Sequence, residues 1–182
     1  TLLRSLLGLV PPTTGDVCFH GRSISAMADA ERLAMRRRCG YVPQDPYSSL
    51  PPTLTVLGAV FEPWNLVYGR ERREEGLKKA QELLAELKLL ALARALILDP
   101  ELLLADEPTA MQDVSTRSEV LDVLARRIRS GMSMILVTHD LLLARYAATR
   151  ALVLCKGEIV EEGDSADLLE HPTHTYTRSL LA

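Results

Sequence analysis

Two adjacent carboxylates, Asp106 and Glu107, directly follow an apolar run at residues 102–105. Such a run is typical of a buried strand, and open parallel sheets bind ligands beyond the carboxyl ends of their strands. An aspartate there suits a ligand of Mg²⁺ on nucleotide phosphates, directly or through water. Side chains alternate near a strand end, so Glu107 points elsewhere and could accept a hydrogen bond from a water that attacks the terminal phosphate. The alternative is two exposed acids, or acids that cap the next helix.

Two more polar side chains follow predicted strands. Gln44 comes after residues 39–43, and His139 comes after the apolar run at 134–138. We expect both to reach the same edge of the sheet as the two carboxylates. His139 could donate a hydrogen bond to the γ-phosphate or contact the attacking water. The alternative is a turn histidine followed by Asp140 as a helix cap; a polar loop residue such as Gln44 gains interest only from its position.

Strands that alternate with helices must position these residues. The predicted helices cover residues 1–10, 28–38, 70–90, 114–129, 140–148, 164–170 and 174–181, and the predicted strands cover 17–20, 39–43, 102–105, 134–138, 151–155 and 158–161. The apolar runs after residue 99 predict strands buried on both faces of a parallel sheet. We therefore predict an α/β fold, with a mainly parallel sheet flanked by helices and a small antiparallel piece on the N-terminal side. A turn at 156–157 predicts a hairpin.

The composition excludes several classes of protein. The chain has 182 residues, of which 47% are hydrophobic and 25% charged, as in an ordinary globular domain. A net charge of −3 and 4% aromatic residues provide neither the field nor the stacking surface that nucleic acid needs. Three scattered cysteines favour neither disulfides nor zinc and suit a reducing compartment. With no secretory signal or membrane span expected, we predict a soluble cytoplasmic protein.

Five stretches resemble ABC-type ATPases. Asp-Glu-Pro-Thr at 106–109, with Asp113, is similar to their Walker B motif and D-loop, and Val-Thr-His-Asp at 137–140 resembles their switch-histidine segment. Residues 41–50 resemble the Q-loop of ATPase subunits in dipeptide and oligopeptide importers. Asp-Val-Ser-Thr-Arg at 113–117 and Tyr-Thr-Arg-Ser-Leu-Leu at 176–181 narrow the resemblance to that subfamily.

The resemblance implies a P-loop NTPase-like fold that binds ATP and Mg²⁺. An ABC-type ATPase domain would span residues 1–182, with a helical subdomain at about 50–95 and a peptide-importer-type tail at 164–182. Asp106 would hold Mg²⁺ through water, and Glu107 would be the general base. Gln44 would contact Mg²⁺ and couple the site to a membrane permease, while His139 would sense the γ-phosphate. Asp113 would communicate across a dimer of two ATPases, although Ala-Met-Gln-Asp at 110–113 departs from the commoner Ser-Ala-Leu-Asp.

Two glycine-rich segments of the family have no counterpart in the sequence. The phosphate-binding loop would come just before Leu2, and only Thr1 remains of it as a nucleotide-contacting residue. The signature Leu-Ser-Gly-Gly-Gln would fall between Leu90 and Ala91. Our hypothesis is that both segments exist in the molecule but are missing from this sequence. If the joint at 90–91 is genuine, residues 70–98 could form one long helix.

The resemblance implies an ATPase subunit that powers import of peptides or related small solutes. Its partners would be membrane permease subunits, a second identical or different ABC ATPase and, indirectly, a solute-binding protein. It would lie peripherally on the cytoplasmic face of the membrane, without binding nucleic acid. Two alternatives stay open: a catalytically incompetent or regulatory ABC domain, and a soluble ABC ATPase outside transport.

Overall fold

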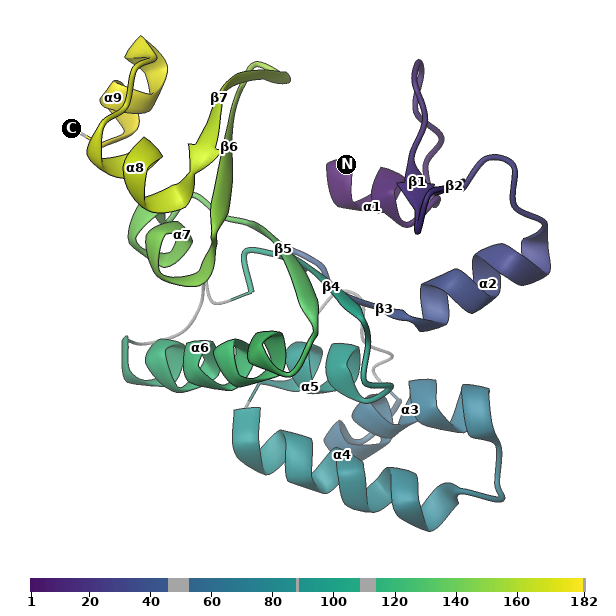
Figure 1. Cartoon of the computed structure of the whole chain (residues 1–182). Coiled ribbons are helices and arrows are strands. Elements are labelled where there is room, and N and C mark those ends of the chain that lie inside the picture. Colours follow the sequence, from purple (N-terminus) through teal and green to yellow (C-terminus); the bar gives the residue numbers. More distant parts are fainter. Residues whose placement is uncertain (46–52, 88, 109–113, 182) are drawn as a thin grey trace. The chain divides into compact units, whose positions relative to one another are not determined.

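The computed structural model describes residues 1–45, 53–87, 89–108 and 114–181 (Figure 1). Its helices and strands follow in the order α1 (Leu2–Leu6), β1 (Cys18–Phe19), β2 (Arg22–Ser23), α2 (Asp29–Arg37), β3 (Cys39–Val42), α3 (Val56–Tyr68), α4 (Arg73–Leu87), α5 (Leu90–Leu96), β4 (Leu102–Asp106), α6 (Val114–Arg129), β5 (Ser133–Val137), α7 (Leu141–Ala147), β6 (Arg150–Cys155), β7 (Glu158–Asp164), α8 (Ser165–Glu170) and α9 (Thr175–Leu181). Residues 1–135 and 136–182 form two compact units.

The first unit contains the parallel sheet that the sequence predicts. Strand β3 pairs in parallel with β4, and β5 follows β4 in the strand order. The start of β5 is joined to the sheet by the Ser133 N–H, which donates to the Glu101 carbonyl at 2.7 Å. Strands β1 and β2 form a small antiparallel pair. Helices flank the sheet, which confirms the predicted α/β fold (Figure 1).

Strand β4 is the centre of the core in this unit. Its three middle residues are fully buried, as expected for a strand covered on both faces. The apolar side of α1 packs on this strand through Leu3 and Leu7, which form a buried cluster with Leu104. These contacts are apolar and non-directional, so they hold α1 against the strand by burial and not by directional bonds.

Helices α3 and α4 pack against each other, and Trp64 of α3 lies against Gly76 of α4. A methyl group added at Gly76 would lie 2.2 Å from the Trp64 ring. The indole N–H of Trp64 donates to the Arg72 carbonyl at 3.0 Å, and the indole is 3% exposed. The guanidinium of Arg72 and the ammonium of Lys79 each lie 5.1 Å from the centre of the indole ring. The glycine therefore makes this close approach of the two helices possible.

A proline inside α3 leaves one carbonyl without its usual partner. Pro63 has no N–H, so the carbonyl of Ala59, four residues earlier, cannot make the usual helical hydrogen bond to it. Arg94 of α5 donates to this carbonyl instead, and the same guanidinium pairs with Glu62 at 2.6 Å. A neighbouring helix thus supplies the hydrogen bond that Pro63 cannot give to the Ala59 carbonyl.

The second unit is built on an antiparallel hairpin of β6 and β7. The turn residues Lys156 and Gly157 both have positive φ, 52° and 89°, which suits the two-residue turn that joins right-twisted strands. The predicted hairpin is therefore confirmed, but placing 151–155 in the parallel sheet is wrong. Alternate residues of β6, among them Leu152 and Leu154, are exposed, because a hairpin strand needs only one buried face.

Strand β5 also differs from the prediction. We expected its apolar run to be buried on both faces, yet Ile135 and Val137 are exposed. Strand β5 ends the order of the described sheet, so within the described residues one of its edges has no strand beside it. The prediction of burial on both faces holds for β4 alone.

The C-terminal helix α9 is fastened to β7 by Glu161. The carboxylate of this residue accepts hydrogen bonds from the Thr173 N–H and hydroxyl, both at 2.7 Å, and from the His174 N–H at 3.2 Å. These donors, with the hydroxyl of buried Thr177 as the strongest influence, lower the pKa of Glu161 to about 2. The geometry of Thr177 nevertheless falls short of a hydrogen bond, so we attribute the fastening to Thr173 and His174.

The helical region around residues 56–96 differs in detail from the prediction. The predicted helix at 70–90 begins later and ends earlier, as α4. The long helix at 70–98 does not form, because Leu89 is extended, with φ −117° and ψ 109°, and α5 starts after it. Leu90 and Ala91 lie together in the first turn of α5. Among the described residues, no helix has the length and apolar character that crossing a membrane requires.

Candidate functional site

Strand β4 delivers Asp106 to the carboxyl edge of the sheet. The preceding residues Leu103, Leu104 and Ala105 are fully buried, whereas Asp106 is half-buried. The backbone of Asp106 is held in a strand anchored on both faces, and its carboxylate is at the border of solvent. This is the position at which a carboxylate can contact a bound cation without the cost of complete burial.

Glu107 has a backbone conformation that residues with side chains seldom adopt. Its φ is +53°, in the left-handed region, and the next residue is Pro108, which further restricts the residue before it. Such conformations cost of order 1–3 kcal/mol and are concentrated at functional sites. The turn ends the strand directly after Asp106. The separate roles of the two carboxylates stay a prediction.

The register between β3 and β4 brings Gln44 to the same edge. Val42 is the partner of Ala105 in the parallel pair. Gln44 follows Val42 by two residues, just as Glu107 follows Ala105. The register therefore places Gln44 and the two carboxylates at the same edge of this pair of strands, and their joint role stays a prediction.

The oxygen atoms at this edge suit Mg²⁺ as a ligand set. Carboxylate and amide oxygens, here those of Asp106 and Gln44, are hard ligands, and Mg²⁺ is often held by one or two protein groups plus water and phosphate oxygens. Across the described ranges, no three His, Cys, Asp or Glu side chains come together as a metal cage. Water and phosphate oxygens would complete the ligands of an ion at this edge.

His139 lies in the second unit, in the turn between β5 and α7. The next residue, Asp140, is the N-cap of α7: its carboxylate accepts from the Leu143 N–H at 3.0 Å. The Asp140 N–H donates to the Thr138 hydroxyl oxygen at 3.0 Å. Asp140 therefore caps the helix, as the alternative interpretation of this segment has it. The role of His139 next to Asp106 and Glu107 stays a prediction.

The two remaining predicted residues lie at an end and at a gap of the described chain. Thr1 is the N-cap of α1, and its hydroxyl does not cap the helix. Its carbonyl accepts from the Ser5 N–H at 3.1 Å. Asp113 lies outside the described residues, as do the rest of the predicted D-loop and residues 46–50 of the predicted Q-loop segment. Their roles stay predictions.

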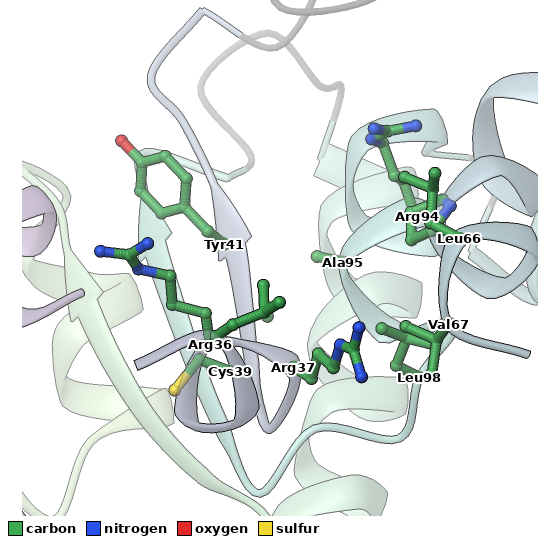
Figure 2. Close-up of a pocket in the computed structure, with 12 residues that line it drawn as sticks. Arg36, Arg37, Cys39, Tyr41, Leu66, Val67, Arg94, Ala95 and Leu98 are labelled. Atoms are coloured by element: carbon green, nitrogen blue, oxygen red, sulfur yellow. The ribbon is translucent and has the colours of Figure 1, made fainter. Parts of the chain in front are cut away.

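A pocket beside β3 was not anticipated from the sequence. It has a volume of about 330 Å³ and lies between α2 and β3 on one side and α3 and α5 on the other (Figure 2). Apolar side chains and three arginines line it: Leu33, Arg36, Arg37, Cys39, Tyr41, Pro63, Leu66, Val67, Arg94 and Leu98, among others. Of the described residues that line it, none is acidic. The signal in the sequence was the arginine run, which is ambiguous without the fold.

The three arginines at 36–38 differ in their contacts. Arg38 makes a two-pronged ion pair with Glu101, at 2.6 Å for each contact. Arg36 donates to backbone carbonyls of Leu7 and Gly8. Only Arg37 is exposed with no hydrogen bond or ion pair to another described residue. Adjacent arginines therefore have three different environments.

Comparison with known proteins identifies the family. The sequence profile of the ABC transporter family matches residues 1–110. The chain belongs to this family. Within the ABC transporter family, a protein of Brucella ovis whose name describes a peptide import ATP-binding protein is 34% identical over 202 residues, covering 100% of this chain. The oligopeptide transport ATP-binding protein OppF of Escherichia coli is 31% identical over 202 residues.

The chain spans 63% of the Brucella ovis relative and 60% of OppF. The matched stretches are longer than the 182 residues of this chain, so both relatives carry residues inside the match that this chain lacks. A solved dimeric structure of the bacterial ABC transporter cassette MJ0796 covers 90% of this chain, with a TM-score of 0.78 and 29% identity, and 79% of that cassette is covered. The same cassette in a post-hydrolysis state, bound to ADP and Pi, matches with a TM-score of 0.77 and 27% identity.

Proposed function

We propose that this chain is the ATP-hydrolysing part of an ABC importer for peptides or related small solutes. The observation that carries the proposal is the edge of β4, where buried residues hold Asp106 in place and a left-handed turn separates Glu107 from it. Family membership supports ATP as the bound nucleotide. The peptide-import names of the relatives support the class of solute.

Each residue at the edge has a distinct proposed role. Asp106 and Gln44 hold Mg²⁺, which supplies charge neutralisation on the phosphates when it is bound. Glu107 is the general base: its carboxylate accepts the proton of the water that attacks the γ-phosphate. His139 contacts the γ-phosphate, and Thr1 contacts the nucleotide at the start of α1. The ADP and Pi in the solved cassette support this reaction class.

A Glu107→Gln variant tests the proposed chemistry. The amide keeps the size of the side chain but cannot accept a proton, so we expect Mg-ATP turnover of the full-length protein to fall by about 10²-fold or more. Binding of the fluorescent analogue TNP-ATP is expected to persist. Glu158→Gln, which removes an exposed carboxylate at the start of β7, is the matched control and keeps its turnover. Equal turnover in the Glu107→Gln and unmodified proteins would show that another group is the base.

The proposed partners are membrane permease subunits and a second ABC ATPase. Asp113 is proposed to act across the ATPase dimer, and the dimeric solved cassette supports such an assembly. The protein is then peripheral, on the cytoplasmic face of the membrane. A solute-binding protein acts through the permease and does not contact this chain.

The pocket beside β3 is the proposed contact for the permease. Strand β3 is a wall of the pocket and ends two residues before Gln44, so an occupant lies next to the segment that leads to the nucleotide edge. Exposed Leu33 and Leu66 offer apolar area, and Arg37 offers a positive charge with no acid in the described lining. The complementary occupant is a short permease segment with apolar side chains and at least one carboxylate.

Reversal of the charge at this pocket tests the contact. We expect Arg37→Glu to abolish copurification with the cognate permease subunits, because two carboxylates would then face each other in a partly apolar pocket. Arg37→Lys is expected to retain it. The matched control is Arg129→Glu, at the exposed end of α6. Unchanged copurification of Arg37→Glu would remove the pocket from the proposed interface.

One observation favours a second candidate, a regulatory ABC domain without turnover. Helix α5 passes through Leu90 and Ala91, where the family signature would fall, and the described residues there contain no glycine-rich loop. The extra residues of the relatives inside the match agree with a segment missing from this chain. Mg-ATP turnover by the full-length protein distinguishes the two candidates, since only the first predicts hydrolysis.

A further inference from the structure

The carboxyl end of α1 is closed first by its own backbone. Gly8 has a φ of +62°, and its N–H donates to the Ser5 carbonyl at 2.9 Å. The N–H of Leu9 donates to the Arg4 carbonyl, also at 2.9 Å. This pair of bonds with a left-handed glycine is the Schellman arrangement, which satisfies two of the last carbonyls of the helix. The carbonyls of Leu7 and Gly8, which follow the helix, take their donors from elsewhere in the chain.

Arg36 of α2 supplies those donors from far along the sequence. Its Nε donates to the Leu7 carbonyl at 3.0 Å, and its Nη2 donates to the Gly8 carbonyl at 2.8 Å. Both bonds are partly buried and come from a planar, permanently charged group whose donors are fixed relative to each other. Arg36 thus contacts the end of α1 at two points, with directional bonds.

These bonds restrict α1 in a way that its apolar contacts do not. Leu3 and Leu7 hold the helix against Leu104 of β4, but such packing permits small rotations and shifts along the helix axis. Two hydrogen bonds at the carboxyl end remove that freedom. Because α1 is rigid over its length, its amino end at Thr1 is fixed relative to β4 and Asp106 as well.

Arg36 also contributes to the wall of the pocket beside β3. Figure 2 shows the guanidinium groups of Arg36 and Arg37 pointing away from each other, with Arg37 directed towards the side where Val67 and Leu98 lie. One arginine of the pair therefore contacts α1, and the other is open to an occupant.

We propose that Arg36 is a positioning residue: it fixes α1 on β4, and through α1 it sets the nucleotide-contacting end of that helix relative to Asp106. The first part of this role, fixing α1 on β4, rests on the contacts alone. The second part, the effect on nucleotide, rests on the proposed function. Arg36 makes no contact with nucleotide in this scheme. Since its side chain is also a wall of the pocket, an occupant of the pocket touches the same side chain that holds α1.

The test separates the two halves in the full-length protein. In the absence of nucleotide, Arg36→Ala is expected to speed amide hydrogen exchange in residues 2–9, while the rest of the chain is unchanged. TNP-ATP affinity is expected to fall about tenfold, the equivalent of about 1.4 kcal/mol. Arg36→Lys keeps the positive charge but not the two fixed donors of the guanidinium, so it is expected to restore both readouts in part. It is also the second variant if Arg36→Ala does not fold. The matched control is Arg32→Ala, which removes an arginine of the same helix whose one ion pair among the described residues is with Asp29.

Each result has a definite meaning. Unchanged exchange in residues 2–9 of both variants overturns the positioning of α1. Faster exchange with unchanged TNP-ATP affinity overturns the link to the nucleotide. An unmodified protein that does not bind TNP-ATP overturns the proposed function, and the exchange measurement still decides whether Arg36 fixes α1.

Discussion

Replacing Gly76 with alanine tests the packing of α3 against α4. In an exposed helix this change would stabilise by about 1 kcal/mol, because alanine is the better helix former. Here the new methyl group would lie 2.2 Å from Cδ1 and 2.5 Å from Nε1 of Trp64, which no side-chain contact tolerates. The indole would have to move by more than 1 Å, roughly the difference between 2.2 Å and an ordinary van der Waals contact.

Trp64 has little freedom to move. It is buried, and its N–H is held by the Arg72 carbonyl. Overpacking of this kind costs about 1–3 kcal/mol, and a lost hydrogen bond adds about 1 kcal/mol. After subtraction of the helix gain, we expect Gly76→Ala to lower the free energy of unfolding by about 1–3 kcal/mol.

Chemical denaturation followed by circular dichroism measures this change. Trp64 is the single tryptophan of the chain, so its fluorescence reports the same packing locally. A double-mutant cycle with Trp64→Phe is the control: the smaller ring leaves room for the methyl group, so alanine at 76 should cost less in that background. A Gly76→Ala variant that is as stable as the unmodified protein, or more stable, would contradict the close approach of α3 and α4.

Three further outcomes are expected. Cys39, whose pKa burial raises to about 11, should react with a maleimide at pH 8 at least tenfold more slowly than exposed Cys18, as measured by peptide mass spectrometry; equal rates would contradict the burial. Glu161→Gln should free α9 at neutral pH, with faster hydrogen exchange in residues 173–181. Because the pKa of Glu161 is lowered on folding from 4.5 to about 2, its stabilisation is complete above pH 4.5 and disappears as the pH falls to about 2, so the variant and the unmodified protein should converge over that range. Leu104→Ala should cost about 2–5 kcal/mol in the free energy of unfolding, since the side chain is fully buried between α1 and the sheet; a loss below 1 kcal/mol would contradict that packing.

The elements that the sequence predicts best carry strong local patterns. The bounds of α6 are those predicted, and β4 extends the predicted strand by Asp106 alone. The run at 102–105 is apolar throughout and is flanked by polar residues, which leaves few alternatives. The edge with Gln44 and the two carboxylates was predictable for the same reason, because parallel strands end on the same side of a sheet.

Helix α3 was not predicted as an element of its own. It is apolar on most sides and contains both a glycine and a proline, so it has no periodic polar face. One available signal was Thr55, which caps the helix by accepting from the Gly58 N–H at 3.1 Å.

The pocket beside β3 could not be predicted from the sequence either, because its lining comes from elements whose packing no local pattern encodes. The prediction that 151–155 is a parallel strand was wrong because an apolar run does not indicate whether the strand beside it is parallel or antiparallel.

The carbonyl that Pro63 leaves open has a consequence for how this part of the chain can vary. With proline at 63, the Ala59 carbonyl depends on Arg94 for its hydrogen bond. With any other residue at 63, a backbone N–H would be present for that carbonyl, which would then no longer depend on Arg94 for its hydrogen bond. A substitution at 94 that is harmful beside proline would then be tolerated. Positions 63 and 94 are therefore expected to change together among relatives, as an epistatic pair, although neither belongs to the nucleotide edge.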